Sequence, residues 1–151
     1  MDLGWKQKIY EESIKVISEK ITHAKSAMQA AQEAANTEEK SSMGDKYETG
    51  RAMSQLAKDM NARQMVAFQN ELNQLQKLSK ILPSKTVTSG ALVQTEQGYF
   101  YIAAAIGAIS INNQKIMVLS SETPVCKAMR GKKADDWYEL NGKKLKILKI
   151  V

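Results

Sequence analysis

Apolar residues in the first part of the chain recur three and four positions apart, which is typical of one face of an α-helix. From Leu3 to Ala35 they form two heptad rows, and these rows predict a single narrow seam on one long helix. No glycine or proline interrupts residues 5–40, a length that would extend roughly 50 Å as an α-helix. The seam positions are Leu3, Tyr10, Ile14, Ile17, Ile21, Ala24, Met28, Ala31 and Ala35.

A second helical pattern runs from Arg51 to Leu82 and stops before Pro83, which cannot continue a helix with its hydrogen bond intact. Two long helices joined by a short break predict an antiparallel coiled-coil hairpin over residues 1–82. The apolar positions of this second helix are Met53, Leu56, Met60, Phe68, Leu72, Leu75, Leu78 and Leu82.

After Pro83 the pattern changes to short β-rich runs separated by turn signals, which predicts a compact α+β domain over residues 83–151. Thr123, Pro124 and Gly131 are placed to cap, begin and end one short helix. Asn141-Gly142 predicts a type I′ hairpin turn. The strands are expected within 86–95, 99–106, 115–121, 137–140 and 143–151, about five in all.

Charge and composition narrow the possible chemistry. Residues 1–82 carry a net charge of +1 and residues 83–151 a net charge of +5, so the second half is suited to nucleic acid or an acidic protein surface.

Cys126 and His23 are the only residues of their kinds, which argues against an internal disulfide, a Cys/His zinc site and a Cys–His nucleophile. Cys126 is expected to be a small buried hydrophobic residue of the short helix, although its proximity to Lys127 and the helix start would lower its pKa. Without an apolar run long enough for a signal peptide or a membrane span, we expect a cytoplasmic protein.

The break between the helices, residues 44–50, carries two acids at a spacing that supports two interpretations. Asp45 and Glu48 lie three residues apart, as in a helix-capping box, and both would complement the positive end of the second helix. Residues three apart on a helix also share one face, so the two carboxylates could bind one divalent cation weakly. In a two-metal site that already holds metal and phosphate, such a pair of carboxylates would help to bind a metal ion.

The segment between the two helices reads Gly44-Asp45-Lys46-Tyr47-Glu48-Thr49. It resembles the G-D-x-x-E-N motif that the Gre-type transcript cleavage factors of bacterial RNA polymerase carry between their two helices. The resemblance spans roughly residues 20–151 and is strongest over residues 115–151. In the C-terminal half it rests on "GALV" at residue 90, "YIAAAIG" at 101, "IMVLSSETPVCKAMRGKK" at 116 and a final apolar strand "LKILKIV".

The resemblance implies a C-terminal domain of FKBP-like fold, with one short helix, that docks on RNA polymerase. The coiled coil would enter the polymerase's secondary channel, where Asp45 and Glu48 help to hold the second magnesium ion. The polymerase would then cleave the 3′ end of backtracked RNA. The protein itself is then expected to be a monomer, to have no cofactor of its own and not to be an enzyme. Contacts with the polymerase would come from Thr123, Pro124, Val125 and Lys127.

Basic residues beside the acids are candidates for contact with the RNA or simply form a solvated face: Lys40, Lys46 and Arg51. The family usually has Leu-Ser where this chain has Lys46-Tyr47, and Asn in place of Thr49. Some relatives occupy the same channel and inhibit or modulate polymerase without promoting cleavage, so this second function stays open. A third alternative, peptidyl-prolyl isomerase activity, rests on the FKBP-like fold alone.

Overall fold

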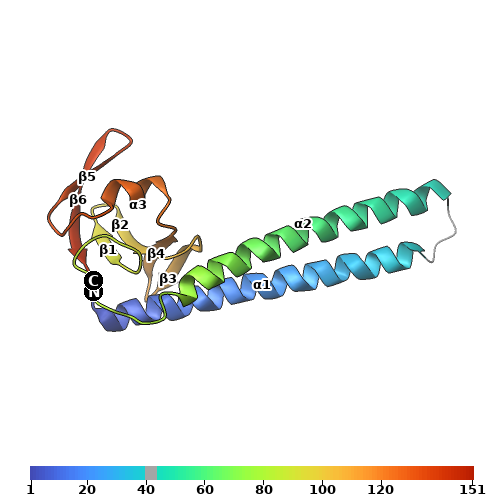
Figure 1. Ribbon diagram of the computed structural model, residues 1–151, viewed down its shortest axis with the longest axis horizontal. Helices are drawn as coiled ribbons and strands as arrows, with labels where there is room; N and C mark the ends of the chain where they lie inside the picture. The colour runs from blue at the N-terminus through green and yellow to red at the C-terminus, as the bar shows by residue number, and fades with distance from the viewer. Residues whose placement is uncertain (40–43) are drawn as a thin grey trace. The chain divides into compact units, whose positions relative to one another are not determined.

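The computed structural model describes the backbone of residues 1–39 and 44–151, and the side chains of residues 1–37 and 49–151. It contains two long helices, α1 (Leu3–Glu39) and α2 (Gly44–Gln76), followed by a six-stranded sheet with one short helix, which confirms the α+β class (Figure 1). Contacts divide the chain into two units. The helical unit is Ile17–Asn70, and the sheet unit comprises Met1–Val16 and Glu71–Val151.

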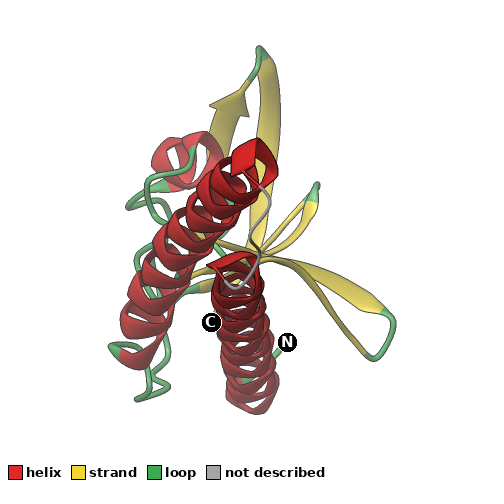
Figure 2. Cartoon of the chain, turned by 90° about the vertical axis from the view of Figure 1, so that its right-hand side faces the viewer, coloured by secondary structure: helices red, strands yellow, loops and turns green. Residues whose placement is uncertain are grey.

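Within the helical unit, α1 and α2 run antiparallel. The Lys20 ammonium lies 5.9 Å from the ring centre of Phe68, whereas Gln32 accepts a hydrogen bond from the Lys58 ammonium. A residue twelve positions further along α1 therefore meets a residue ten positions earlier in α2. Figures 1 and 2 show these stretches of the two helices side by side.

The predicted seam of α1 is largely correct in the helical unit but incomplete near the N-terminus. Ile17, Ile21 and Ala24 are buried, as expected. Leu3, in contrast, is 40% exposed, and the buried residues of the first turns are Lys6, Ile9 and Ser13. The reason is that residues 1–16 pack in the sheet unit, which selects a different face of the helix.

The predicted seam of α2 is wrong in its first half, because Met53, Leu56 and Met60 are 63%, 54% and 60% exposed. A second series at the same three- and four-residue spacing is half-buried instead: Ser54, Lys58, Asn61, Met65 and Phe68. The small residues of α1 leave room for the long stem of Lys58 to lie against that helix.

Helix α2 ends at Gln76, six residues before the expected end at Leu82. The amide of Leu78 donates a hydrogen bond to the carbonyl of Leu75 at 2.8 Å. The amide of Ser79 likewise donates a hydrogen bond to the carbonyl of Gln76 at 3.2 Å. These tighter turns end the α-helix before Pro83 is reached.

The sheet has the strand order β3-β4-β2-β1-β6-β5, and only the β2–β4 pairing is parallel. It has one strand more than expected, because the run after Ile102 bends and a separate strand starts at Gly107. The strands are β1 (Leu92–Thr95), β2 (Gly98–Ile102), β3 (Gly107–Ile111), β4 (Gln114–Leu119), β5 (Trp137–Leu140) and β6 (Lys143–Ile150).

Two hairpins of the sheet turn through a pair of residues with positive φ, as type I′ turns require. Asn141 and Gly142, at φ 54° and 77°, confirm the predicted turn between β5 and β6. Asn112 and Asn113, at φ 51° and 64°, make the β3–β4 turn, which the strand patterns did not predict. Asn tolerates this conformation better than most residues, so the Asn-Asn pair was a usable signal.

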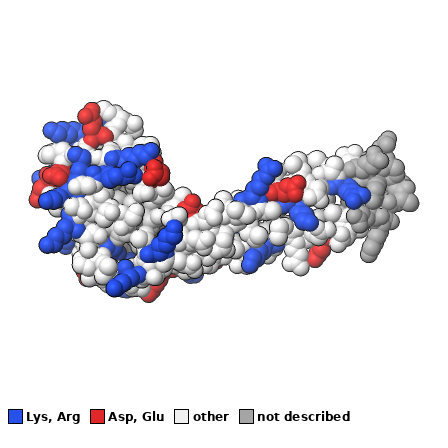
Figure 3. Space-filling view, viewed as in Figure 1, with Lys and Arg blue, Asp and Glu red and all other residues white. Residues whose placement is uncertain are grey.

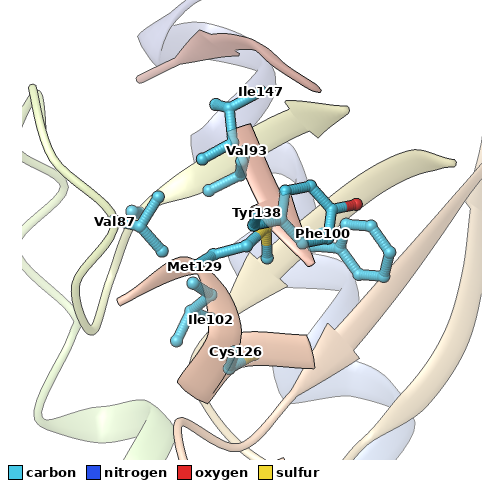
Figure 4. Close-up of a cluster of buried hydrophobic side chains, with 9 residues drawn as sticks. Val87, Val93, Phe100, Ile102, Cys126, Met129, Tyr138 and Ile147 are labelled. Atoms are coloured by element: carbon cyan, nitrogen blue, oxygen red, sulfur yellow. The ribbon is translucent and has the colours of Figure 1, made fainter. Parts of the chain in front are cut away.

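Helix α3 (Pro124–Met129) covers one face of the sheet. Its buried residues Cys126 and Met129 pack in one cluster with side chains from β1, β2, β5 and β6 (Figure 4). The rest of that cluster is Val87, Ala91, Val93, Phe100, Ile102, Tyr138 and Ile147. The core on this face therefore joins α3 to four of the six strands.

The first turns of α1 are tied to the sheet unit by both packing and hydrogen bonds. The rings of Trp5 and Tyr99 meet edge to face with their centres 4.8 Å apart. Lys6 is only 2% exposed. Its ammonium group donates hydrogen bonds to the carbonyls of Leu82 at 2.7 Å and Val151 at 2.9 Å. One buried amine thus links α1, the segment after α2 and the last residue.

We expect Met129→Ala to lower the free energy of unfolding by about 2–5 kcal/mol, because the fully buried thioether would leave a cavity. Met60→Ala is the matched control. Since Met60 is 60% exposed, its replacement should change stability by less than about 0.5 kcal/mol. Urea unfolding measures both, and an equally large loss for Met60→Ala would contradict the observed face of α2.

Burial lowers the pKa of Lys6 from 10.5 to about 8, so folding should become more favourable as pH rises between these values. In that window the unfolded chain binds more protons than the folded chain. The difference in unfolding free energy between wild type and Lys6→Met should therefore grow, by as much as about 3 kcal/mol, between pH 7.5 and 10. Lys8→Met, at an exposed lysine, serves as the control, and a pH-independent difference for Lys6→Met would contradict the prediction.

Candidate functional site

The acidic pair lies in the first turn of α2. The backbone is helical at Asp45, Lys46 and Glu48, while Lys40 lies outside the described residues. The side chains of residues 38–48 also lie outside the described part, so both capping and metal assistance stay predictions. Arg51, one turn further along the helix, is exposed.

The expected docking segment is the start of α3. Thr123 occupies the N-cap position, but its side chain makes no capping hydrogen bond, which corrects the predicted cap. Its hydroxyl instead donates to the carbonyl of Ser120 at 3.0 Å, which fixes the turn before the helix. Pro124 stands at the first helical turn, as predicted, because its missing N–H needs no partner there.

The four expected docking residues differ in their exposure. Pro124 and Lys127 are exposed, Thr123 is half-buried, and the half-buried Val125 packs against the core cluster. The geometry therefore leaves Pro124 and Lys127 as the residues of this segment that a partner would meet first.

Charge around α3 is partly balanced by one acid. The Glu122 carboxylate lies 3.6 Å from the Lys127 ammonium and 3.4 Å from the Arg130 guanidinium. Both pairs are exposed, so each contributes little to stability and the charges remain available to a partner. Arg130 also donates to the carbonyl of Ser121 at 2.9 Å, which holds its side chain along the preceding loop.

A cavity of about 280 Å³ borders α3 on the side of the loop before β1. It is open and combines an apolar floor with one acid and one base at its edge. The lining residues are Val87, Thr88, Ser89, Ile102, Ser121, Glu122, Cys126 and Arg130. We assign it no ligand, because its charged groups already pair with each other.

Cys126 is 2% exposed and lies on the floor of that cavity. Burial raises the pKa of its thiol, and this outweighs the opposite effects of a hydrogen bond with Thr123 and of the Arg130 charge. The lowering expected from Lys127 and the helix start is therefore wrong. The thiol is a small core side chain and not a nucleophile.

The outer face of the β5–β6 hairpin carries an aromatic and basic patch, whose exposed Trp137 the sequence analysis did not identify. Trp137 is 45% exposed, with the ammonium groups of Lys144 and Lys146 at 5.4 and 5.9 Å from its ring centre. Strand alternation contained the signal, since Trp137 shares its face with the polar Glu139 and the buried Tyr138 points the other way. Figure 3 shows several basic side chains, with a few acidic ones among them, on the visible face of the sheet unit.

Comparisons with known proteins do not identify a family: no family model matches the sequence, and no match was found among curated proteins. Within the part of the chain that the structure describes, no three His, Cys, Asp or Glu residues gather as metal ligands. Among the described helices, none is both long and apolar enough to cross a membrane.

We expect Cys126 to resist alkylation by iodoacetamide at pH 7.5 in the folded protein and to react readily in 6 M guanidinium. Burial keeps the reagent away from the Cys126 sulfur, and by raising the pKa it keeps the thiol protonated. Mass spectrometry over time gives both rates. Rapid labelling of the folded chain would contradict a buried thiol.

Proposed function

We propose that this protein is a cytoplasmic elongation factor that binds bacterial RNA polymerase and stimulates cleavage of backtracked RNA by the polymerase active site. The observation that carries the proposal is the position of the acidic pair, at the junction of two antiparallel helices. Asp45 and Glu48 lie in the first turn of α2, directly after the segment that joins it to α1.

The helical unit supports the proposal by its pairing. Lys20 meets Phe68, and Gln32 meets Lys58, so the ends of α1 and α2 nearest residues 40–43 lie at the same end of this unit. An arm of two antiparallel helices can enter a narrow channel while it carries acidic side chains at its end. Two carboxylates would help to hold a magnesium ion that polymerase and RNA phosphate already bind.

The sheet unit supports the proposal through α3. Cys126 and Met129 anchor this helix in the core, and Pro124 and Lys127 remain exposed beside it. A rigid, exposed helix start of this kind is suited to docking, because little conformational entropy is lost on binding. The net charge of +5 over residues 83–151 favours an acidic partner surface.

In the proposed mechanism the protein supplies position and charge, and the polymerase supplies the catalytic centre. The FKBP-like domain docks through Thr123, Pro124, Val125 and Lys127. Asp45 and Glu48 then add negative charge beside the metal that activates water, while Lys40, Lys46 and Arg51 attract the RNA 3′ end. Without polymerase the protein would cleave nothing.

A regulator that occupies the channel without stimulating cleavage is the second candidate. The observation that favours it is Lys46-Tyr47, which replaces the Leu-Ser usual between the two acids in the family that the chain resembles. A positive charge between the carboxylates would compete for them with the metal. Peptidyl-prolyl isomerase activity, the third alternative, has no observation of its own beyond the fold resemblance.

Cleavage of RNA in a backtracked polymerase complex tests the proposal. Wild type should stimulate cleavage, and Asp45→Ala and Glu48→Ala should each reduce the stimulated rate by roughly 10- to 100-fold, as loss of a metal-supporting group does. Polymerase binding should be unchanged in both variants. Lys127→Glu should instead weaken binding, because it reverses the charge at the docking segment.

Matched controls separate these effects from general loss of charge. Glu33→Ala removes an exposed acid from α1, and Lys115→Glu reverses an exposed lysine outside α3, so both should behave as wild type. If wild type binds polymerase and never stimulates cleavage, the second candidate replaces the first. If the alanine variants cleave at the wild-type rate, the acids only cap the helix.

A further inference from the structure

The sheet unit contains a second cavity, of about 450 Å³, that the proposed function does not use. It is built from the first turns of α1, the segment after α2, the loop before β1 and strand β2. The lining residues are Lys6, Lys77, Leu78, Lys80, Ile81, Leu82, Pro83, Ser84, Ser89, Gly90 and Tyr101. This size is within the range of cavities that bind small molecules.

The charged residues of this lining are all basic. Lys6, Lys77 and Lys80 contribute three ammonium groups, and no aspartate or glutamate is among the lining residues. Lys77 and Lys80 are exposed, whereas Lys6 is 2% exposed. A cavity with this charge repels cations and attracts anions.

The Lys6 ammonium can donate one more hydrogen bond than the two that it makes. An ammonium group has three N–H bonds, and Lys6 donates two of them, to the carbonyls of Leu82 and Val151. The third is left for a ligand. Because its two partners, Leu82 and Val151, belong to segments far apart in the sequence, the amine is held in place before any ligand arrives.

Tyr101 also lines the cavity, and its hydroxyl is a second buried donor. Tyr101 is fully buried, and its oxygen has no hydrogen-bond partner among the described residues. Buried polar groups in folded proteins are almost always paired, so an unpaired one indicates a missing partner. Burial, together with nearby Tyr10, raises the pKa of Tyr101 to about 12, so the hydroxyl keeps its proton at neutral pH.

We propose that this cavity binds a small phosphate-bearing molecule. Its phosphate accepts hydrogen bonds from Lys6 and Tyr101 and is neutralised by Lys77 and Lys80. Lysine is a common phosphate ligand, and hydroxyl donors complete such sites. The apolar residues between the lysines, Leu78, Ile81, Leu82 and Pro83, contact the rest of the molecule. A cavity of about 450 Å³ has room for more than inorganic phosphate, which favours a phosphate monoester of a small metabolite.

Titration of the full chain with ribose 5-phosphate, followed by amide chemical shifts in nuclear magnetic resonance spectra, tests the site. Ribose is the matched ligand without phosphate, and sodium chloride keeps the ionic strength constant throughout. We expect saturable shifts for ribose 5-phosphate that are concentrated in residues 77–90 and around Tyr101, and no saturable shifts for ribose.

Two variants test the named donors without removing the buried amine. Tyr101→Phe keeps the ring and deletes the hydroxyl, so it should weaken binding about tenfold. The double variant Lys77→Gln/Lys80→Gln should weaken binding further and reduce its dependence on salt. Lys85→Gln/Lys115→Gln removes the same charge from exposed positions outside the lining and should bind like wild type. Thermal unfolding confirms that each variant is folded.

Three results would overturn the proposal: no saturable binding of ribose 5-phosphate, equal binding of ribose, or equal weakening by the Lys85→Gln/Lys115→Gln control. In each case Lys6 is only a structural tie between α1 and the last strand. The result is independent of the proposed function, because cleavage by polymerase is assayed without this ligand.

Discussion

The six-stranded sheet has two apolar faces, and the need to cover both determines most of the sheet unit. Helix α3 covers one face through Cys126 and Met129. The first turns of α1 pack in the same unit, where Trp5 meets Tyr99 and Lys6 donates hydrogen bonds to the carbonyls of Leu82 and Val151. A short domain of strands alone would leave much apolar surface in water, so the start of a distant helix becomes part of its core.

This constraint explains why one long helix presents two different faces. In its first turns α1 buries Lys6, Ile9 and Ser13, and after Ile17 it buries the seam that faces α2. Burial of Lys6 is unfavourable for its charge, yet the carbonyls of Leu82 and Val151 accept its hydrogen bonds and offset part of that cost. The same amine ties α1 to the sheet unit and contributes, with Lys77 and Lys80, to the positive charge of the cavity that it lines.

The two proposed sites differ in how far the structure supports them. The phosphate cavity is argued from described contacts, with a buried amine and an unpaired hydroxyl in one lining. The acidic pair is argued from chain position and from a resemblance, because the side chains of Asp45 and Glu48 are outside the described part. Trp137 and the start of α3 are exposed on the sheet unit.

The sequence by itself determined the elements: two long helices, a change to strands after Pro83, the Asn141-Gly142 turn and Pro124 at the start of α3. These follow from local periodicity and backbone preference, which need no tertiary partner. Only the tertiary structure decided which face each element buries. Helix α2 carries two stripes at the same spacing, and packing against α1 chose the one with Lys58 over the one with Met60. Likewise, the lining around Lys6 joins residues from four distant parts of the chain, and no local pattern encodes a juxtaposition of that kind.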